Sequence, residues 1–126
     1  STMENDLKNE VIKVHDRIMP RTEELLASKK ALLQVVSSLD SLKQSRPATD
    51  TAAIRAQADS LVRALNAADE AMSDWMYAFK TDYSGMEHEE IMIYLNEEKN
   101  KITAVEHAYE ESITGARRLL NHINQE

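Results

Sequence analysis

Histidine and methionine recur in pairs, four residues apart, at three places in this chain. On a helix, residues four apart lie on one face, so each pair would place a thioether beside an imidazole or a second thioether. Soft ions such as Cu(I) prefer these ligands. The pairs are His15 and Met19, Met72 and Met76, and His88 and Met92. If the three pairs converge, the sequence predicts a Cu(I)-type metal site made of these six residues.

The way the chain folds back decides whether the pairs converge. Folding about connections near Pro47 and Gly85 places all three pairs toward one end of the molecule, with His15 near Lys80 and Glu90. The same register brings three aromatic residues to that end: Trp75, Phe79 and Tyr94.

A structural account competes with the metal site. In it, methionine fills irregular space near a proline kink and stacks on aromatic rings, while the histidines sit half-buried beside carboxylates or water. Axial ligation of haem by histidine and methionine is a third account. A three-helix core of long side chains leaves little room for a macrocycle, so we expect no haem.

The elements that position these residues are predicted to be helices. Between residues 91 and 123, mostly apolar residues alternate at spacings of four and three, which is the heptad pattern of a helix with a buried seam. The seam comprises Ile91, Leu95, Glu98, Ile102, Val105, Tyr109, Ser112, Ala116, Leu119 and Ile123. We interpret Glu98 as a polar layer that sets register, or as a carboxylate whose stem lies along the core edge, in preference to a catalytic acid.

The whole pattern predicts an all-α protein, an elongated antiparallel three-helix up-down-up bundle that forms a single domain over residues 1–126. The helices are expected at about 4–44, 50–80 and 87–124. Pro20 lies inside the first range and lacks a backbone donor, so the first helix should be kinked near it. Two glycines and two prolines are far fewer than a sheet protein with several turns needs.

The first predicted helix carries a second apolar stripe beside its seam. The stripe comprises Ile12, His15, Met19, Leu26, Leu33 and Val36. A helix with so wide an apolar face can touch two neighbours within its own bundle. An interaction module predicts instead that some stripe residues, such as Leu26 and Leu33, stay exposed as a contiguous patch.

Composition excludes several functions. The net charge of −7 disfavours nucleic acid and anionic membrane surfaces as partners. The absence of cysteine excludes a thiol nucleophile, a disulfide scaffold and thiolate metal sites. No glycine-rich phosphate loop, Glu-x-x-His pair or HExxH motif is present, and no apolar run approaches the roughly 20 residues of a transmembrane helix. We therefore expect a protein that is not an enzyme and has no transmembrane segment.

Three local strings resemble a family of small, uncharacterised bacterial lipoproteins, some of whose members are labelled "viral A-type inclusion protein". The strings are VIKVHDRIMP at 11–20, AMSDWM at 71–76 and HEEIMIYL at 88–95. The resemblance implies an exported protein, in the periplasm or at the outer membrane, tethered by a lipid on a cysteine upstream of such a region. It implies no activity, ligand or functional residue.

These observations lead to two expectations about function. The first is a non-enzymatic binding or structural module of the bacterial cell envelope, a monomer or homodimer with a protein partner that the sequence does not identify. The alternative is a soft-metal protein that uses the six His and Met residues.

Overall fold

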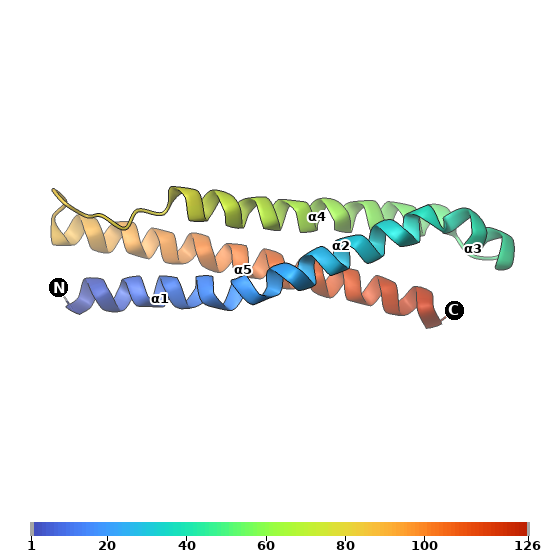
Figure 1. The fold of residues 1–126 in the computed structure, drawn as a ribbon, viewed down its shortest axis with the longest axis horizontal. Coiled ribbons are helices and arrows are strands. Elements are labelled where there is room, and N and C mark those ends of the chain that lie inside the picture. The colour runs from blue at the N-terminus through green and yellow to red at the C-terminus, as the bar shows by residue number, and fades with distance from the viewer. Residues whose placement is uncertain (1, 126) are drawn as a thin grey trace.

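The computed structural model describes residues 2–125, and residues 1 and 126 lie outside the described part (Figure 1). The described residues form helices and connections without a strand, which confirms the all-α prediction. The elements are α1 (Thr2–Ile18), the 3-10 helix η1 (Met19–Arg21), α2 (Thr22–Ser37), α3 (Leu39–Ser45), α4 (Thr51–Ala78) and α5 (His88–Gln125).

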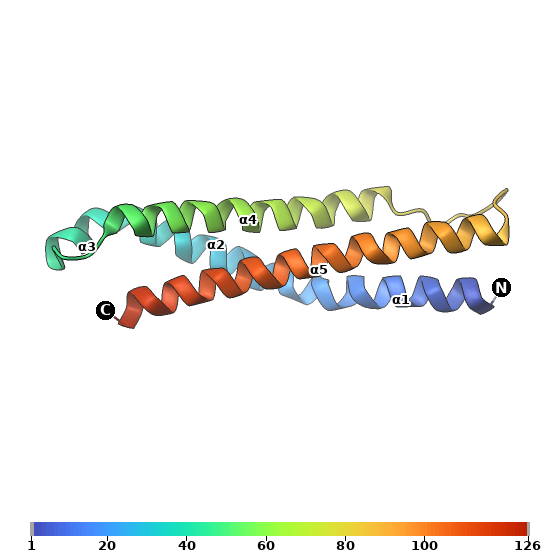
Figure 2. The same ribbon diagram turned by 180° about the vertical axis from the view of Figure 1, so that it is seen from behind.

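The helices lie lengthwise beside one another in an elongated molecule. In Figure 1, α1, α2 and α3 follow one another along its length, α4 runs back, and α5 runs in the direction of α1. Figure 2 shows α5 lying between α1 and α4. The main contacts agree, because α1 packs on α5 whereas α2 packs on both α4 and α5. The chain therefore shifts toward α4 as it passes from α1 to α2.

Ion pairs show how α1, η1 and α2 are aligned along α5. Three pairs join residues 89 positions apart: Glu10 with Lys99 at 3.2 Å, Arg17 with Glu106 at 2.8 Å, and Arg21 with Glu110 at 3.4 Å. A constant separation means that α1 and α5 run parallel. Beyond η1, Glu24 pairs with Arg117, 93 positions away, so α2 is displaced by about one helical turn relative to α5.

The kink expected near Pro20 is a short 3-10 segment. Pro20 has no backbone N–H to donate and its ring clashes with the preceding turn, so the α-helix cannot continue unchanged through it. The backbone N–H of Thr22 donates to the carbonyl of Met19, and the Thr22 hydroxyl donates to the same oxygen at 2.9 Å. These bonds restart the helix as α2.

A second interruption, at Ser38, was not predicted. Ser38 has φ −102° and ψ 2°, and its N–H donates to the carbonyls of Gln34 and Val35. The hydroxyl of Ser37 also donates to the Gln34 carbonyl, at 2.8 Å. Serine side chains compete in this way with the helical hydrogen bonds of the backbone. The range expected as one helix at 4–44 is thus divided into α1, α2 and α3.

The ends of α4 explain why it is shorter than the range 50–80. At its start, the Asp50 carboxylate accepts a hydrogen bond from Ala53 N at 3.0 Å, as a helix-capping aspartate does. At its end, Phe79 is extended (φ −67°, ψ 123°), and the N–H of Lys80 donates to the Tyr94 hydroxyl at 2.7 Å. In the connection that follows, Gly85 has a φ of 82°, which glycine adopts without strain.

The heptad seam of α5 faces the core. Every seam residue is buried except Ile123, which is half-buried. Glu98 is buried: the Tyr94 hydroxyl donates to Oε1 at 3.3 Å, and Lys101 Nζ forms an ion pair 3.2 Å from Oε2, which accepts no hydrogen bond within residues 2–125. Its contacts are those of a paired polar residue in the seam, because a buried carboxylate is stable only with such partners.

Tyr109 gives the core a measurable pH dependence. Its ring is fully buried, its hydroxyl donates to Asp69 at 3.2 Å, and burial followed by the charge of Asp69 raises the pKa of Tyr109 to about 12. The unfolded pKa is about 10, so the contribution of the protonated phenol is complete below about pH 10 and is lost as the pH rises toward 12. We expect the free energy of unfolding to fall across this window, and to fall less steeply in Tyr109→Phe. Urea unfolding at a series of alkaline pH values measures it, and equal slopes in the two proteins would contradict the assignment.

Candidate functional site

A row of aromatic rings connects α1, α4 and α5 at one end of the molecule. The ring centroids of His15 and Trp75 are 6.1 Å apart, those of Trp75 and Phe79 are 4.7 Å apart, and those of Phe79 and Tyr94 are 6.1 Å apart. Tyr83 extends the row, 6.0 Å from Tyr94. The three aromatic residues expected to gather do so, with Tyr83 as an addition.

His15 lies beside Trp75, not near Lys80 and Glu90 as the expected register has it. The expected register assumes one continuous helix up to the connection near Pro47. In the structure, η1 and the turn at Ser38 interrupt this helix and change its length and direction. Because α4 runs antiparallel to α1, Met19 is about level with Met72, and His15 is about level with Met76. The first two His/Met pairs therefore share one region of the molecule.

The third pair lies elsewhere. His88 Nδ1 is 2.6 Å from Glu4 Oε2, and Glu4 precedes His15 by eleven residues on the same helix. At 1.5 Å per residue, this places His88 about 16 Å from His15 along the axis. Met92 packs on the separate apolar cluster that contains Leu7. The structure therefore does not bring His88 and Met92 to the other four residues.

The four remaining residues occupy different environments. Met72 is buried in the main core, which matches the structural account for this residue, whereas Met19 and Met76 are exposed. His15 Nδ1 lies 3.0 Å from the carboxylate of Asp16. Within residues 2–125, no three His, Asp or Glu residues are grouped so that they could hold a metal ion. A mixed imidazole and thioether site stays a prediction for these four, which anaerobic Cu(I) titration of wild type and His15→Ala would test.

The second place of interest is the outer flank of α2. Leu26 and Leu33 are 55% and 48% exposed, although their neighbours Leu25 and Leu32 are 1% and 0% exposed. A surface depression of about 390 Å³ lies over this flank. Its lining, which we call the α2 patch, comprises Leu26, Lys29, Lys30, Leu33, Gln34 and Ser37. The predicted interaction patch at Leu26 and Leu33 is therefore exposed, while the rest of the second stripe is half-buried except for Met19.

Helix geometry explains why these leucines stay outside. Successive residues are about 100° apart around a helix, so turning Leu25 and Leu32 into the core leaves Leu26 and Leu33 on its edge. The pairing of Glu24 with Arg117 holds α2 in that rotation against α5. Burying the stripe would require α2 to roll and to withdraw its inner leucines from the core.

Sequence reasoning missed the two lysines of the α2 patch. Lys29 and Lys30 lie three and four residues after Leu26, which puts both on the same face as the two leucines. Neither lysine forms an ion pair within the described part of the chain. The signal was present in the spacing, as a basic pair framed by two apolar residues seven positions apart.

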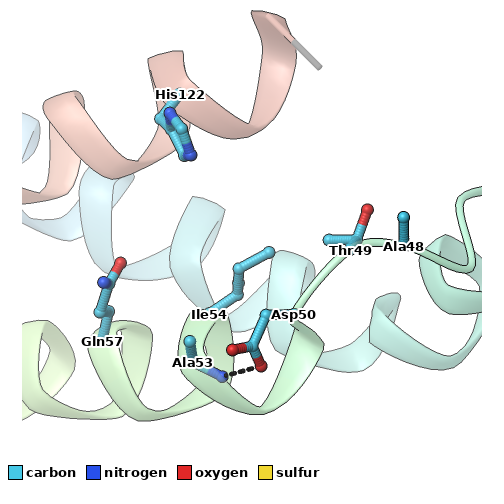
Figure 3. A pocket seen from close by; sticks show the side chains of 7 residues that line it. All are labelled: Ala48, Thr49, Asp50, Ala53, Ile54, Gln57 and His122. Carbon is cyan, nitrogen blue, oxygen red and sulfur yellow. Dashed lines mark hydrogen bonds between the residues drawn. The ribbon is translucent and has the colours of Figure 1, made fainter.

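A third region lies between the start of α4 and the end of α5. It forms a hollow of about 390 Å³. Figure 3 shows Asp50 and Gln57 on the α4 side of this hollow and His122 of α5 across from them. The Asp50 carboxylate caps α4 through Ala53 N. The cap brings a negative charge to the helix N-terminus, which would otherwise attract an anion. An anion at this end of α4 would therefore meet the Asp50 carboxylate.

Comparisons of the chain with protein-family models, with curated proteins and with solved structures give no match. None of the helices between residues 2 and 125 combines the length and apolar character needed to cross a bilayer. The functional interpretation therefore depends on the surfaces described above, among which the α2 patch is the most distinctive.

Proposed function

We propose that this protein is a non-enzymatic binding module of the bacterial cell envelope, built as an elongated antiparallel three-helix up-down-up bundle. It binds a protein partner through the α2 patch. The observation that carries the proposal is the exposure of Leu26 and Leu33 on a helix whose adjacent leucines are completely buried. Complete burial of an exposed leucine side chain stabilises by about 1.5–3 kcal/mol, and these two side chains are about half exposed, so a partner that covers both gains a part of that value from each.

The location at the envelope is supported by the resemblance to bacterial lipoproteins. The proposal of a non-enzymatic role rests on the sequence, which contains no recognisable catalytic motif. The Tyr94 hydroxyl donates to Glu98, the Tyr109 hydroxyl donates to Asp69, and the Asp50 carboxylate caps α4. General acid–base catalysis needs a proton donor or acceptor that is positioned within hydrogen-bond reach of a substrate.

Photo-crosslinking inside cells tests the proposed function. A photoreactive amino acid is placed at position 26 or 33 of the full native gene product, and the matched control carries it at Arg63, an exposed residue of α4. We expect one protein to crosslink from both stripe positions and not from position 63. The same products from all three positions, or none from positions 26 and 33, would contradict the proposal.

A further inference from the structure

The charge within the α2 patch identifies the chemistry of its partner. We infer that the occupant is an acidic amphipathic helix of another protein, which rests on the proposed function of the patch. Lys29 and Lys30 line the same depression as Leu26 and Leu33 and have no carboxylate partner within residues 2–125. A helix that carries leucine-like residues flanked by Glu or Asp would fill the depression and pair with both ammonium groups.

Lys29 and Lys30 differ in this respect from the basic residues that pair across the α5 interface, although Lys13 and Arg118 likewise form no ion pair within residues 2–125. On that side, basic residues of either helix meet a carboxylate across the interface: Arg17 with Glu106, Arg21 with Glu110, Lys99 with Glu10, and Arg117 with Glu24. The chain as a whole has a net charge of −7. An acidic partner is repelled by most of such a surface, so a basic apolar patch directs it to α2.

The spacing of the leucines indicates a helical partner. Leu26 and Leu33 are seven residues apart, which is about two helical turns or 10.5 Å along α2. A helix lying nearly along α2 presents its own apolar residues at the same interval, as helices do when they dock in apolar grooves.

A second copy of this chain fits the patch poorly. In a symmetric antiparallel pair of α2 helices, the residue that faces Leu26 is Leu33 of the other copy, and the axis then falls between Lys29 and Lys30. Four ammonium groups would meet at that axis with no carboxylate between them. Like charges placed opposite one another across an interface are repulsive, so the arrangement of two copies that pairs their leucines is disfavoured.

Two designed peptides of about 20 residues test the inference. Both carry leucine at heptad positions, and the flanking positions are Glu in one peptide and Lys in the other. Fluorescence anisotropy measures binding to four proteins: wild type, Lys29→Glu/Lys30→Glu, Leu26→Ser/Leu33→Ser, and the control Lys13→Glu, which reverses one exposed charge on α1. Lys and Glu have similar helix propensity, so the charge variants keep the helix.

We expect the Glu peptide to bind wild type and Lys13→Glu about tenfold or more tightly than the Lys peptide does. The preference should reverse in Lys29→Glu/Lys30→Glu, and both peptides should lose binding to Leu26→Ser/Leu33→Ser.

Each of the following results would overturn the inference. Equal binding of the two peptides that still requires the leucines would leave the proposed function standing and remove the acidic partner. Binding that ignores the leucines, or no binding of either peptide, would remove the patch as the docking site. Dimerisation lost in the leucine variants would identify a second copy as the occupant, and binding to anionic vesicles lost in Lys29→Glu/Lys30→Glu would identify a membrane surface.

Discussion

Leu32→Ala is expected to lower the free energy of unfolding by about 2–5 kcal/mol, whereas Leu33→Ala should change it by about 1 kcal/mol or less. The two residues are neighbours on α2 and have identical side chains, but Leu32 lies in the main core and Leu33 is exposed. Replacing Leu32 removes apolar contacts and leaves a cavity among residues of α4 and α5. Replacing Leu33 removes a side chain that is already half in water, and alanine favours the helix slightly.

Urea unfolding followed by far-UV circular dichroism measures both values under one set of conditions. Leu25→Ala and Leu26→Ala repeat the comparison one heptad earlier on the same helix. The account is contradicted if the two members of either pair destabilise equally, because the exposed leucines would then contribute to folding and their exposure would carry no functional meaning.

Trp75→Ala is expected to lower the free energy of unfolding by about 3–5 kcal/mol. Trp75 is buried on α4, and its ring stacks on Phe79 and contacts the ring of His15. Removing it breaks the row of rings that connects α1, α4 and α5, and it opens a cavity at the end where α4 gives way to an extended segment.

Trp75→Phe should cost much less than Trp75→Ala. The buried indole Nε1 has no hydrogen-bond partner among residues 2–125, so the phenyl ring loses no hydrogen bond and keeps most of the stacking. Tyr77→Ala is the matched control, since this ring lies two residues away and is 95% exposed. Thermal unfolding of the three variants gives the ranking. A cost for Trp75→Phe equal to that of Trp75→Ala would mean that the indole N–H makes a bond essential to the fold.

Local periodicity predicted most of the residues that face the core, although Ile113 and Ala58 are buried outside the predicted stripes. The seam of α5 is predicted residue by residue because a helix repeats every 3.6 residues, and a heptad pattern identifies the buried face without knowledge of its partner. The effect of Pro20 was equally local, since proline lacks a donor wherever it occurs. The turn at Ser38 depends on weaker competition between serine side chains and backbone carbonyls, and a serine pair within a helix gives no comparable signal.

The relative positions of residues on different helices, measured along the long axis of the molecule, could not be predicted with the same accuracy. A periodic pattern gives the face of a helix but not its displacement along the axis, which depends on turns and connections. The consequence is clear at His88, which was expected beside the other His/Met pairs and instead lies against Glu4. Ion pairs such as Arg17 with Glu106 mark this displacement in the structure, but the sequence does not identify them, because many other carboxylates in an acidic chain could pair with the same arginine.

The α2 patch was only half anticipated. The second stripe identifies Leu26 and Leu33 as candidates for an exposed patch. The sequence does not show whether α2 buries this stripe against α4. The decision depends on the rotation of α2, in which Leu25 and Leu32 fill the core and Glu24 meets Arg117. The two lysines gain significance only after the leucines beside them are known to be exposed.

The central claim is that the α2 patch is uncovered in the free protein, and thiol labelling tests it most directly. The chain has no cysteine, so single cysteines at positions 25, 26, 32 and 33 each provide one unambiguous reporter. The account predicts rapid labelling at positions 26 and 33, close to the rate of an unfolded peptide and independent of protein concentration, with strong protection at positions 25 and 32. Protection at 26 and 33 equal to that at 25 and 32 would contradict it, because the patch would then already be covered.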